Sequence, residues 1–402
     1  MMEAKNWHKL PVLFCLYIAQ SIPMSFFSTV VPVIMRQENY SLQSIGLLQL
    51  VKLPWILKFL WAPIVDNHTR SLRDLRRWIV ASELFYAIII LSIGFFNLQA
   101  DFKLVILLMV VAFISSATQD IAVDIYAILM LKPSERSIGN SIQSAGTFVG
   151  SIFGTGVLLI AYHYFGWNYL LVLLAAFVLI ALVPLLSYRQ PLPSSTAIVK
   201  RISFTDIFRF FAIKGMYKWV LVLIFYYSGI IGILSMVKPY LVDLGYNIKQ
   251  IGFLSGILGT SVAAISAFVA GFIVKKIGRK TSLYAFLAAS FGAGAFFWLI
   301  SHGTPSMSLL YAAVMLLWCS YGLSTVIIYT IAMDKVRPGC EGTDFTLQIV
   351  ITHLSGLIFA VISGRLADSF GYHNFFGIEA LFSLIAMIIL SITLRQSNNA
   401  NQ

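Results

Sequence analysis

Long and nearly continuous apolar segments, separated by short polar ones, make up most of the chain. Twelve can be drawn, at about residues 10–35, 41–65, 78–97, 102–130, 138–162, 168–187, 217–241, 248–274, 281–301, 307–332, 344–367 and 374–394. A helix of about 20 residues crosses a hydrocarbon core about 30 Å thick. Strands of a membrane barrel would instead alternate apolar and polar residues over about ten positions. The pattern predicts an all-α membrane protein with 12 transmembrane helices, the first of them a retained helix rather than a cleaved signal.

Composition narrows the class of protein further. Of 402 residues, 59% are hydrophobic and only 11% charged, whereas soluble domains carry about 25% charged residues. A water-soluble enzyme and a disordered chain are therefore excluded. The three cysteines, Cys15, Cys319 and Cys340, lie far apart and have neither disulfide nor zinc spacing. We expect no catalytic residues, no metal and no cofactor.

The distribution of Lys and Arg predicts orientation and domains. Of 28 such residues, 21 fall in segments on the side of the N-terminus and 4 on the other side, which places both termini in the cytoplasm. Because the net charge of +12 lies in short loops, it predicts topology rather than nucleic-acid binding. The longest polar break predicts an N-terminal six-helix bundle (1–187), a cytoplasmic linker with some surface helix (188–216), a C-terminal six-helix bundle (217–394) and a polar tail (395–402).

The two predicted bundles repeat each other at an offset of 205 residues. Phe165-Gly166-Trp167 corresponds to Phe370-Gly371-Tyr372, Pro133 to Pro338, and Gln143 to Gln348. Two parallel six-helix repeats joined by a cytoplasmic linker are typical of transporters, in which the substrate binds near the midplane between the halves. Repetition alone would also fit a simple duplication.

One loop between predicted helices has the pattern of a conformational latch. It contains two glycines and four cations, Gly271, Lys275, Lys276, Gly278, Arg279 and Lys280. Glycine permits a tight turn or a close helix approach, and the cations can meet carboxylates and helix C-termini. The corresponding loop of the first half keeps Asp66 and Arg70 but lacks the glycines. Plain positive-inside charge explains the cations but not Gly271 and Gly278.

Charged residues inside predicted helices are the main candidates for function, because each costs about 2.5–3.5 kcal/mol to insert. Lys52 and Lys58 lie in the second helix, and Asp120 and Asp124 share one face of the fourth. Lys58 and Asp120 lie at similar depth, so Lys58 can pair with Asp120 or Asp124. Two close carboxyls suit proton coupling; the alternative is a purely structural ion pair. Lys52 is the better candidate to meet an anionic substrate.

Weaker candidates lie on these and on other predicted helices. Gln20, Trp55, Gln119, Gln348 and His353 are expected in the substrate cavity. Glu83 is expected to pair with the cluster of Arg76 and Arg77.

Two strings carry a family resemblance. Residues 54–66 read Pro-Trp-Ile-Leu-Lys-Phe-Leu-Trp-Ala-Pro-Ile-Val-Asp, and residues 117–124 read Ala-Thr-Gln-Asp-Ile-Ala-Val-Asp. Both resemble the AmpG-related branch of the major facilitator superfamily, which includes AmpG muropeptide permeases, acetyl-CoA transporters and siderophore permeases of the RhtX/FptX type. Pro54-Trp55, Gly139-Asn140 and Gln143 look most similar to the siderophore permeases. The loop motif around Gly271 resembles the superfamily's loop motif.

The resemblance implies a proton-driven importer of a bulky solute in the bacterial inner membrane, with Lys58, Asp66, Gln119, Asp120 and Asp124 at matching positions. The leading interpretation is siderophore import. A muropeptide permease and an exporter of drugs or metabolites are alternatives, and a membrane enzyme or a receptor would also fit some features. The expected partners are a small-molecule solute and membrane lipid but no nucleic acid, and we expect a monomer.

Overall fold

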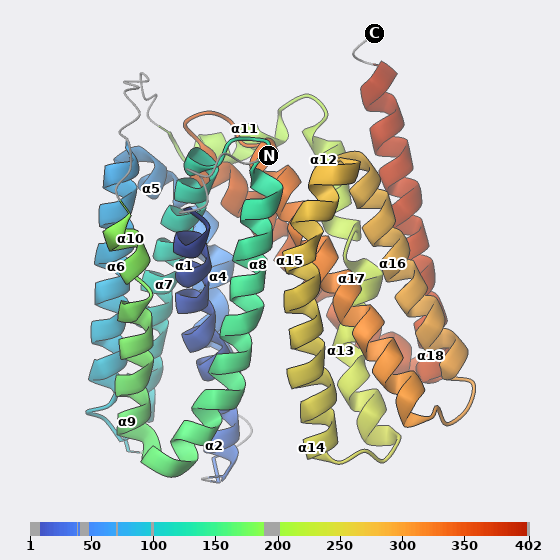
Figure 1. Ribbon diagram of the computed structural model, residues 1–402, viewed down its shortest axis with the longest axis horizontal. Helices are drawn as coiled ribbons and strands as arrows, with labels where there is room; N and C mark the ends of the chain where they lie inside the picture. The colour runs from blue at the N-terminus through green and yellow to red at the C-terminus, as the bar shows by residue number, and fades with distance from the viewer. Residues whose placement is uncertain are drawn as a thin grey trace. The chain divides into compact units, whose positions relative to one another are not determined.

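The computed structural model describes residues 9–37, 39–40, 48–69, 71–97, 100–188 and 202–399. Throughout these ranges the regular structure is helical, without strands. The chain forms two compact units (Figure 1). The first comprises Met1–Phe204 and Val336–Thr346, and the second comprises Thr205–Lys335 and Leu347–Gln402. Part of the predicted linker, residues 189–201, and the end of the predicted tail, 400–402, lie outside the described residues.

The helices of the first unit follow the predicted segments with one exception. They are α1 (Lys9–Ser25), the π-helical η2 (Phe26–Val30), α2 (Val31–Gln37), the 3-10 helix η3 (Gln49–Lys52), α4 (Leu53–Leu57), η4 (Lys58–Leu60), α5 (Ala62–His68), α6 (Leu72–Ile93), α7 (Phe102–Met130), α8 (Arg136–Ile152), the π-helical η5 (Phe153–Val157), α9 (Leu158–Ile180) and α10 (Val183–Ser187).

The exception is the second predicted helix, which is broken into short pieces from η3 to α5. Pro54 and Pro63 stand at the first turns of α4 and α5. Proline fits the first turn of a helix but lacks the N–H that would continue a preceding one. The segment predicted at about 41–65 is therefore helical over its described part but is not one regular α-helix, and residues 41–47 lie outside the described ranges.

Close backbone contact joins α1 to α8 in the first unit. A Cβ added at Gly146 would lie 2.8 Å from the carbonyl oxygen of Phe14, and one at Gly150 would lie 3.1 Å from that of Ile18. Only glycine allows helices to approach this closely. Elsewhere in the unit α6 packs on α7. A buried cluster that includes Phe26, Phe27 and Phe113 fills the interior.

The second unit has its own set of packed helices. They are α11 (Thr205–Phe211), α12 (Met216–Phe225), α13 (Ser228–Asp243), α14 (Ile248–Ile251), the π-helical η6 (Gly252–Leu258), α15 (Gly259–Ile277), α16 (Arg279–Ile300), α17 (Met307–Asp334) and α18 (Glu341–Asn399), whose first residues belong to the first unit. Helix α17 packs on both α15 and α16. The short α11 lies within residues 188–216, the range predicted as a linker.

Two glycines turn the longest helical segments back on themselves. Gly166 in α9 has φ 74° and ψ −175°, and Gly371 in α18 has φ 71° and ψ 162°. This backbone region is open essentially to glycine alone. The two residues are those matched at the 205-residue offset, so this part of the predicted repeat has the same local structure in both halves.

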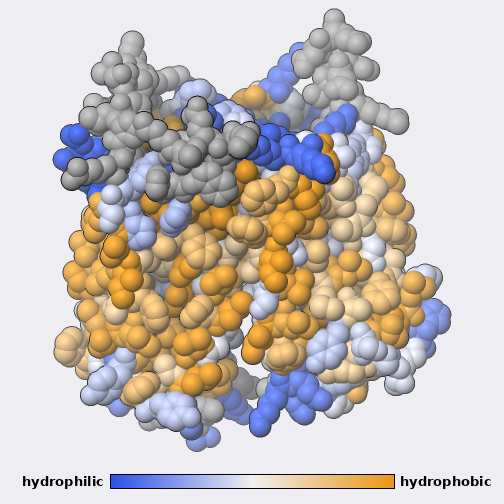
Figure 2. All heavy atoms as spheres, viewed as in Figure 1, coloured by the Kyte–Doolittle hydropathy of each residue, from blue (hydrophilic) through white to orange (hydrophobic). Residues whose placement is uncertain are grey.

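The surface and the helix lengths are those of a membrane protein. In each unit apolar residues cover the middle and hydrophilic residues gather at the ends (Figure 2). Eight helical segments among the described residues are long and apolar enough to cross a membrane. Two of them, Arg136–Ser187 and Glu341–Thr393, contain the turns at Gly166 and Gly371. The count of twelve and the orientation remain predictions.

Candidate transport site

A buried ion pair in the first unit joins the second predicted helix to the fourth. Lys58 Nζ contacts Asp120 Oδ2, and the two residues are 1% and 4% exposed. Trp55 also lies against the ammonium group, with its ring centre 5.0 Å from Nζ. The same two segments are joined by Trp61 Nε1, which donates to Thr118 Oγ1 at 3.1 Å. The pairing expected from helix depth is therefore present.

Helix α1 supplies polar partners to the same face of α7. Tyr17 donates its hydroxyl to Asp124 Oδ1, and Gln20 Nε2 donates to Gln119 Oε1 at 2.5 Å. Asp124, Gln119 and Gln20 are all buried. Because residues three apart lie on the same face of a helix, Tyr17 follows from the position of Gln20, although the sequence interpretation missed it. Together, α1, η4 and α7 hold two carboxyls, one ammonium, one phenol and two amides.

Several buried amide and hydroxyl atoms near this set have no hydrogen-bond partner among the described residues. They are Gln119 Nε2, both amide atoms of Gln143, Ser141 Oγ and Ser144 Oγ. The last three residues lie on α8, which packs against α1. Buried polar atoms are nearly always paired with protein or water. These atoms are therefore available to a polar ligand or to ordered water.

The predicted cavity residues of the second half are placed differently. Gln348 is fully buried and uses its amide inside the second unit: its Oε1 accepts from Trp219 Nε1 at 2.6 Å, and its Nε2 donates to the carbonyl of Ala332 at 3.2 Å. His353 is exposed on α18. Gln348 thus stabilises the packing of α12, α17 and α18, unlike its repeat partner Gln143.

In the first half, the predicted cavity residue Lys52 is half-buried in η3.

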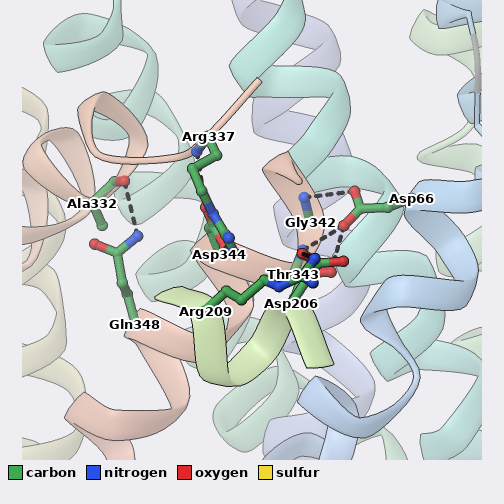
Figure 3. A network of polar contacts seen from close by, with 9 residues as sticks. All are labelled: Asp66, Asp206, Arg209, Ala332, Arg337, Gly342, Thr343, Asp344 and Gln348. Carbon is green, nitrogen blue, oxygen red and sulfur yellow. Dashed lines mark hydrogen bonds and ion pairs between the residues drawn. The ribbon is translucent and has the colours of Figure 1, made fainter. Parts of the chain in front are cut away.

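Asp66 caps the start of α18, as the labelled side chain in Figure 3 shows. Its carboxylate accepts from the backbone N–H of Gly342 at 2.8 Å and of Thr343 at 2.7 Å, and from Thr343 Oγ1 at 2.6 Å. A carboxylate at a helix N-terminus satisfies unpaired N–H groups and meets the positive end of the helix dipole. Burial raises the pKa of Asp66 to about 7, although the three donors act in the opposite direction.

The loop of the second unit contains the turn that its glycine pattern predicts. Gly278 has φ 82° between α15 and α16, and Gly271 is buried on α15. Arg279 forms an ion pair with Asp334, the last residue of α17. Lys275 and Lys280 are exposed. The corresponding Arg70 of the first half lies outside the described residues.

Two buried glutamates depart from the sequence interpretation. Glu83 was expected to pair with Arg76 and Arg77, and this is wrong: its Oε1 has no partner among the described residues. Arg76 instead donates to the carbonyl groups of Leu186 and Tyr188, and Arg77 pairs with Asp74 at 3.8 Å. Burial of Glu83 well inside α6 explains the difference.

Glu379 was missed altogether. It is fully buried in α18, and its sequence signal was a lone carboxyl in an apolar helix.

Comparison with known proteins agrees with this architecture. The family model described as Major Facilitator Superfamily matches residues 13–360. The chain belongs to this superfamily. The anhydromuropeptide permease of Escherichia coli K12 is 24% identical over 395 residues, covering 96% of this chain and 79% of the relative. The transporter designated AmpG 4 of Rickettsia conorii is 21% identical over 408 residues, covering 95% and 96% of the two chains. The predicted resemblance to the AmpG-related branch is confirmed.

A solved structure shows the same fold. The superfamily transporter FucP, crystallised in the outward conformation, aligns with a TM-score of 0.73 at 15% identity, covering 96% of this chain and 99% of that one. The superfamily is one of transporters, so the partner of the chain is a small-molecule solute. With bacterial permeases as relatives and several apolar membrane-crossing helices, the chain is a multi-pass protein of the bacterial inner membrane.

Proposed function

We propose that this superfamily member imports an anhydromuropeptide by proton-coupled symport. The observation that carries the proposal is the buried set around Lys58, Asp120 and Asp124 in the first unit. A single ammonium faces two buried carboxyls, so one negative charge exceeds the positive charge on these three side chains. Such an excess in a low dielectric favours uptake of a proton.

The geometry suggests how a proton and a solute share the site. A proton that arrives on Asp120 neutralises the carboxylate that holds Lys58. The freed ammonium can then bind a carboxylate of the solute, while the phenol of Tyr17 holds Asp124 in place. Release of the proton on the opposite side restores the Lys58–Asp120 pair and expels the solute carboxylate. In both states Lys58 has a carboxylate partner and Asp124 keeps the hydrogen bond from Tyr17, which lowers the cost of the buried charges.

The neutral groups beside this set favour a muropeptide over a siderophore. A sugar linked to a peptide presents many hydroxyls and amides, and its recognition requires neutral donors and acceptors. Gln119, Gln143 and Ser144 supply such atoms, which have no partner among the described residues. The name of the Escherichia coli relative points to the same class of solute.

Siderophore import, the leading interpretation from sequence, is the second candidate. The half-buried Lys52 favours it, because many ferric siderophores are anionic. The motif from Pro54 to Gln143 also resembles that of siderophore permeases.

The latch role of Asp66 and of the Gly271–Lys280 loop, with Arg70, is a further part of the proposal. Asp66 holds the start of α18 and Arg279 holds the end of α17; in the proposed latch these contacts break and reform during transport.

The test is uptake into proteoliposomes with an imposed inward proton gradient. Labelled anhydromuropeptide and a labelled ferric siderophore are offered separately to the wild type and to Asp120→Asn and Asp124→Asn. We expect muropeptide accumulation that a protonophore abolishes and that falls at least tenfold in both variants. Asp74→Asn, a substitution of a partly exposed surface carboxyl, is the matched control and should accumulate solute normally.

Each result has a distinct meaning. Accumulation of the siderophore alone would replace the solute and retain the mechanism. Full gradient-driven uptake of muropeptide by both Asn variants would reduce the carboxyls to a structural role. Uptake of neither solute by folded protein would overturn the proposed function.

A further inference from the structure

We propose that Glu379 of the second unit is a second intramembrane proton-binding site, occupied by a proton in this conformation. Its part in transport rests on the proposed proton-coupled function, but the bound proton itself does not. The starting observation is a carboxyl that is 0% exposed, with Oε2 lacking any partner among the described residues.

The site is built across the turn of α18. Glu379 and Ser363 each lie eight residues from Gly371, on the two arms of the hairpin. Ser363 Oγ, also fully buried, donates to Glu379 Oε1 at 2.5 Å. In a neutral acid, Oε1 would then be the carbonyl oxygen and Oε2 would carry the proton.

Two glycines of α13 make room for the carboxyl group. A Cβ added at Gly232 would collide with both carboxyl oxygens of Glu379, and one at Gly229 would collide with the carbonyl oxygen of Glu379 and with Ser383 Oγ. The backbone of α13 therefore lies directly against the acid. Water is excluded on this side, so the carboxyl cannot be solvated as an anion.

No positive charge balances Glu379 within the described part of the chain. Helices α13, α16 and α18 surround Glu379. The ionisable residues closest to it along these helices are Lys238, Tyr240 and Asp243 of α13, Arg365, Asp368, Tyr372 and His373 of α18, and Tyr284 and His302 on or just beyond α16. None of them forms an ion pair with it. Lys238 and Arg365 are exposed. A bare buried carboxylate costs far more than a neutral acid with one unpaired O–H.

The position of the site suits exchange with one side of the membrane. Eight residues at about 1.5 Å each place it roughly 12 Å from the turn at Gly371. In the predicted orientation that turn faces the outside, from which an inward proton gradient supplies protons. Glu379 differs from Asp120, which is held by Lys58. Glu379 can lose its proton only when the packing around α13 and α18 opens.

Infrared difference spectroscopy of the full chain in lipid membranes tests the proposal without any solute. The spectrum of Glu379→Gln is subtracted from that of the wild type at pH 7, in H2O and then in D2O. We expect one protonated-carboxyl C=O band in the wild type that is absent from the variant, and a shift of that band to lower frequency in D2O. The same band should survive in Asp120→Asn.

A second variant keeps the test sharp if Glu379→Gln fails to fold. Ser363→Ala removes only the donor to Oε1, so the band of Glu379 should move to higher frequency. Absence of a difference band with folded Glu379→Gln, or an unmoved carboxyl region in Ser363→Ala, would show that Glu379 carries no proton. A band that never shifts in D2O would show a sealed structural acid and overturn the exchange site. Failure of solute uptake in the wild type would overturn the proposed function and leave the spectroscopic result standing.

Discussion

Asp66 accepts two hydrogen bonds from the single residue Thr343, one from its backbone N–H at 2.7 Å and one from its hydroxyl at 2.6 Å. The carboxyl thus caps a helix whose first turn begins 275 residues later in the chain. The capping residue is itself only 4% exposed. Its ionisation therefore affects the stability of the fold.

The effect of pH on Asp66 has a definite sign. Burial raises its pKa to about 7 in the folded protein, above the value of about 3.9 for an unfolded Asp. The stabilisation from its bound proton is present below the unfolded value and is lost as pH rises through about 7. We expect the Tm of the wild type, relative to that of Asp66→Asn, to fall between about pH 5 and pH 8. Thermal unfolding at both pH values checks this, and a constant difference would contradict it.

The ion pair of Lys58 and Asp120 should show strong energetic coupling. Lys58→Met or Asp120→Asn alone leaves one buried charge without its partner, so each should lower the free energy of unfolding by about 3–5 kcal/mol. The double variant removes both charges and should recover most of the loss. Unfolding in detergent, followed by tryptophan fluorescence, measures all three. Additive losses would mean that the two side chains do not interact.

Gln143 and Gln348 occupy matching positions of the repeat but should respond oppositely to substitution by Met. Neither amide atom of Gln143 has a partner among the described residues, so Gln143→Met should keep or raise Tm while reducing solute uptake by roughly tenfold. Gln348→Met leaves the indole N–H of Trp219 unpaired and should cost about 1–3 kcal/mol. Parallel unfolding and uptake assays check the pair. Equal destabilisation of both would remove Gln143 from the solute site.

The glycine contact between α1 and α8 predicts a steric effect. In Gly150→Ala the new Cβ would lie 2.7 Å from Ser21 Cβ and 3.1 Å from the Ile18 carbonyl oxygen, which should destabilise the protein by about 1–3 kcal/mol. Gly156→Ala meets nothing within 4 Å and is the control, with an expected change between zero and a small gain. Thermal unfolding of both variants decides, and equal behaviour would contradict the close approach.

Sequence patterns could predict those features that depend on local periodicity or on depth in the membrane. Lys58 and Asp120 were paired because both lie about equally far from the ends of their helices. Gly166 and Gly371 were matched as equivalent positions because their neighbours repeat, although no turn was predicted at either. In each case the signal is a spacing along the sequence, measured either from the end of a helix or between the two repeats.

Features that depend on distant packing could not be predicted in this way. The partners of Asp66 are separated from it by more than 270 residues, and nothing in the local pattern names them. The use of the Gln348 amide by Trp219 depends on how α12 meets α18. Glu83 was assigned to nearby arginines by sequence distance, but its side chain is buried within the unit. Pro54 and Pro63 mark the breaks in the second predicted helix, but the long apolar run around them led to the prediction of a single helix.

The absence of side chains at Gly146 and Gly150 has a mechanical consequence. At these two positions α8 has no side chain of its own that could rearrange while one helix slides past the other. We therefore expect the two helices to move together as one rigid unit. This unit carries Tyr17 and Gln20 on α1 and Gln143 on α8. A small tilt of the unit would therefore displace hydrogen-bonding groups of both helices at the same time.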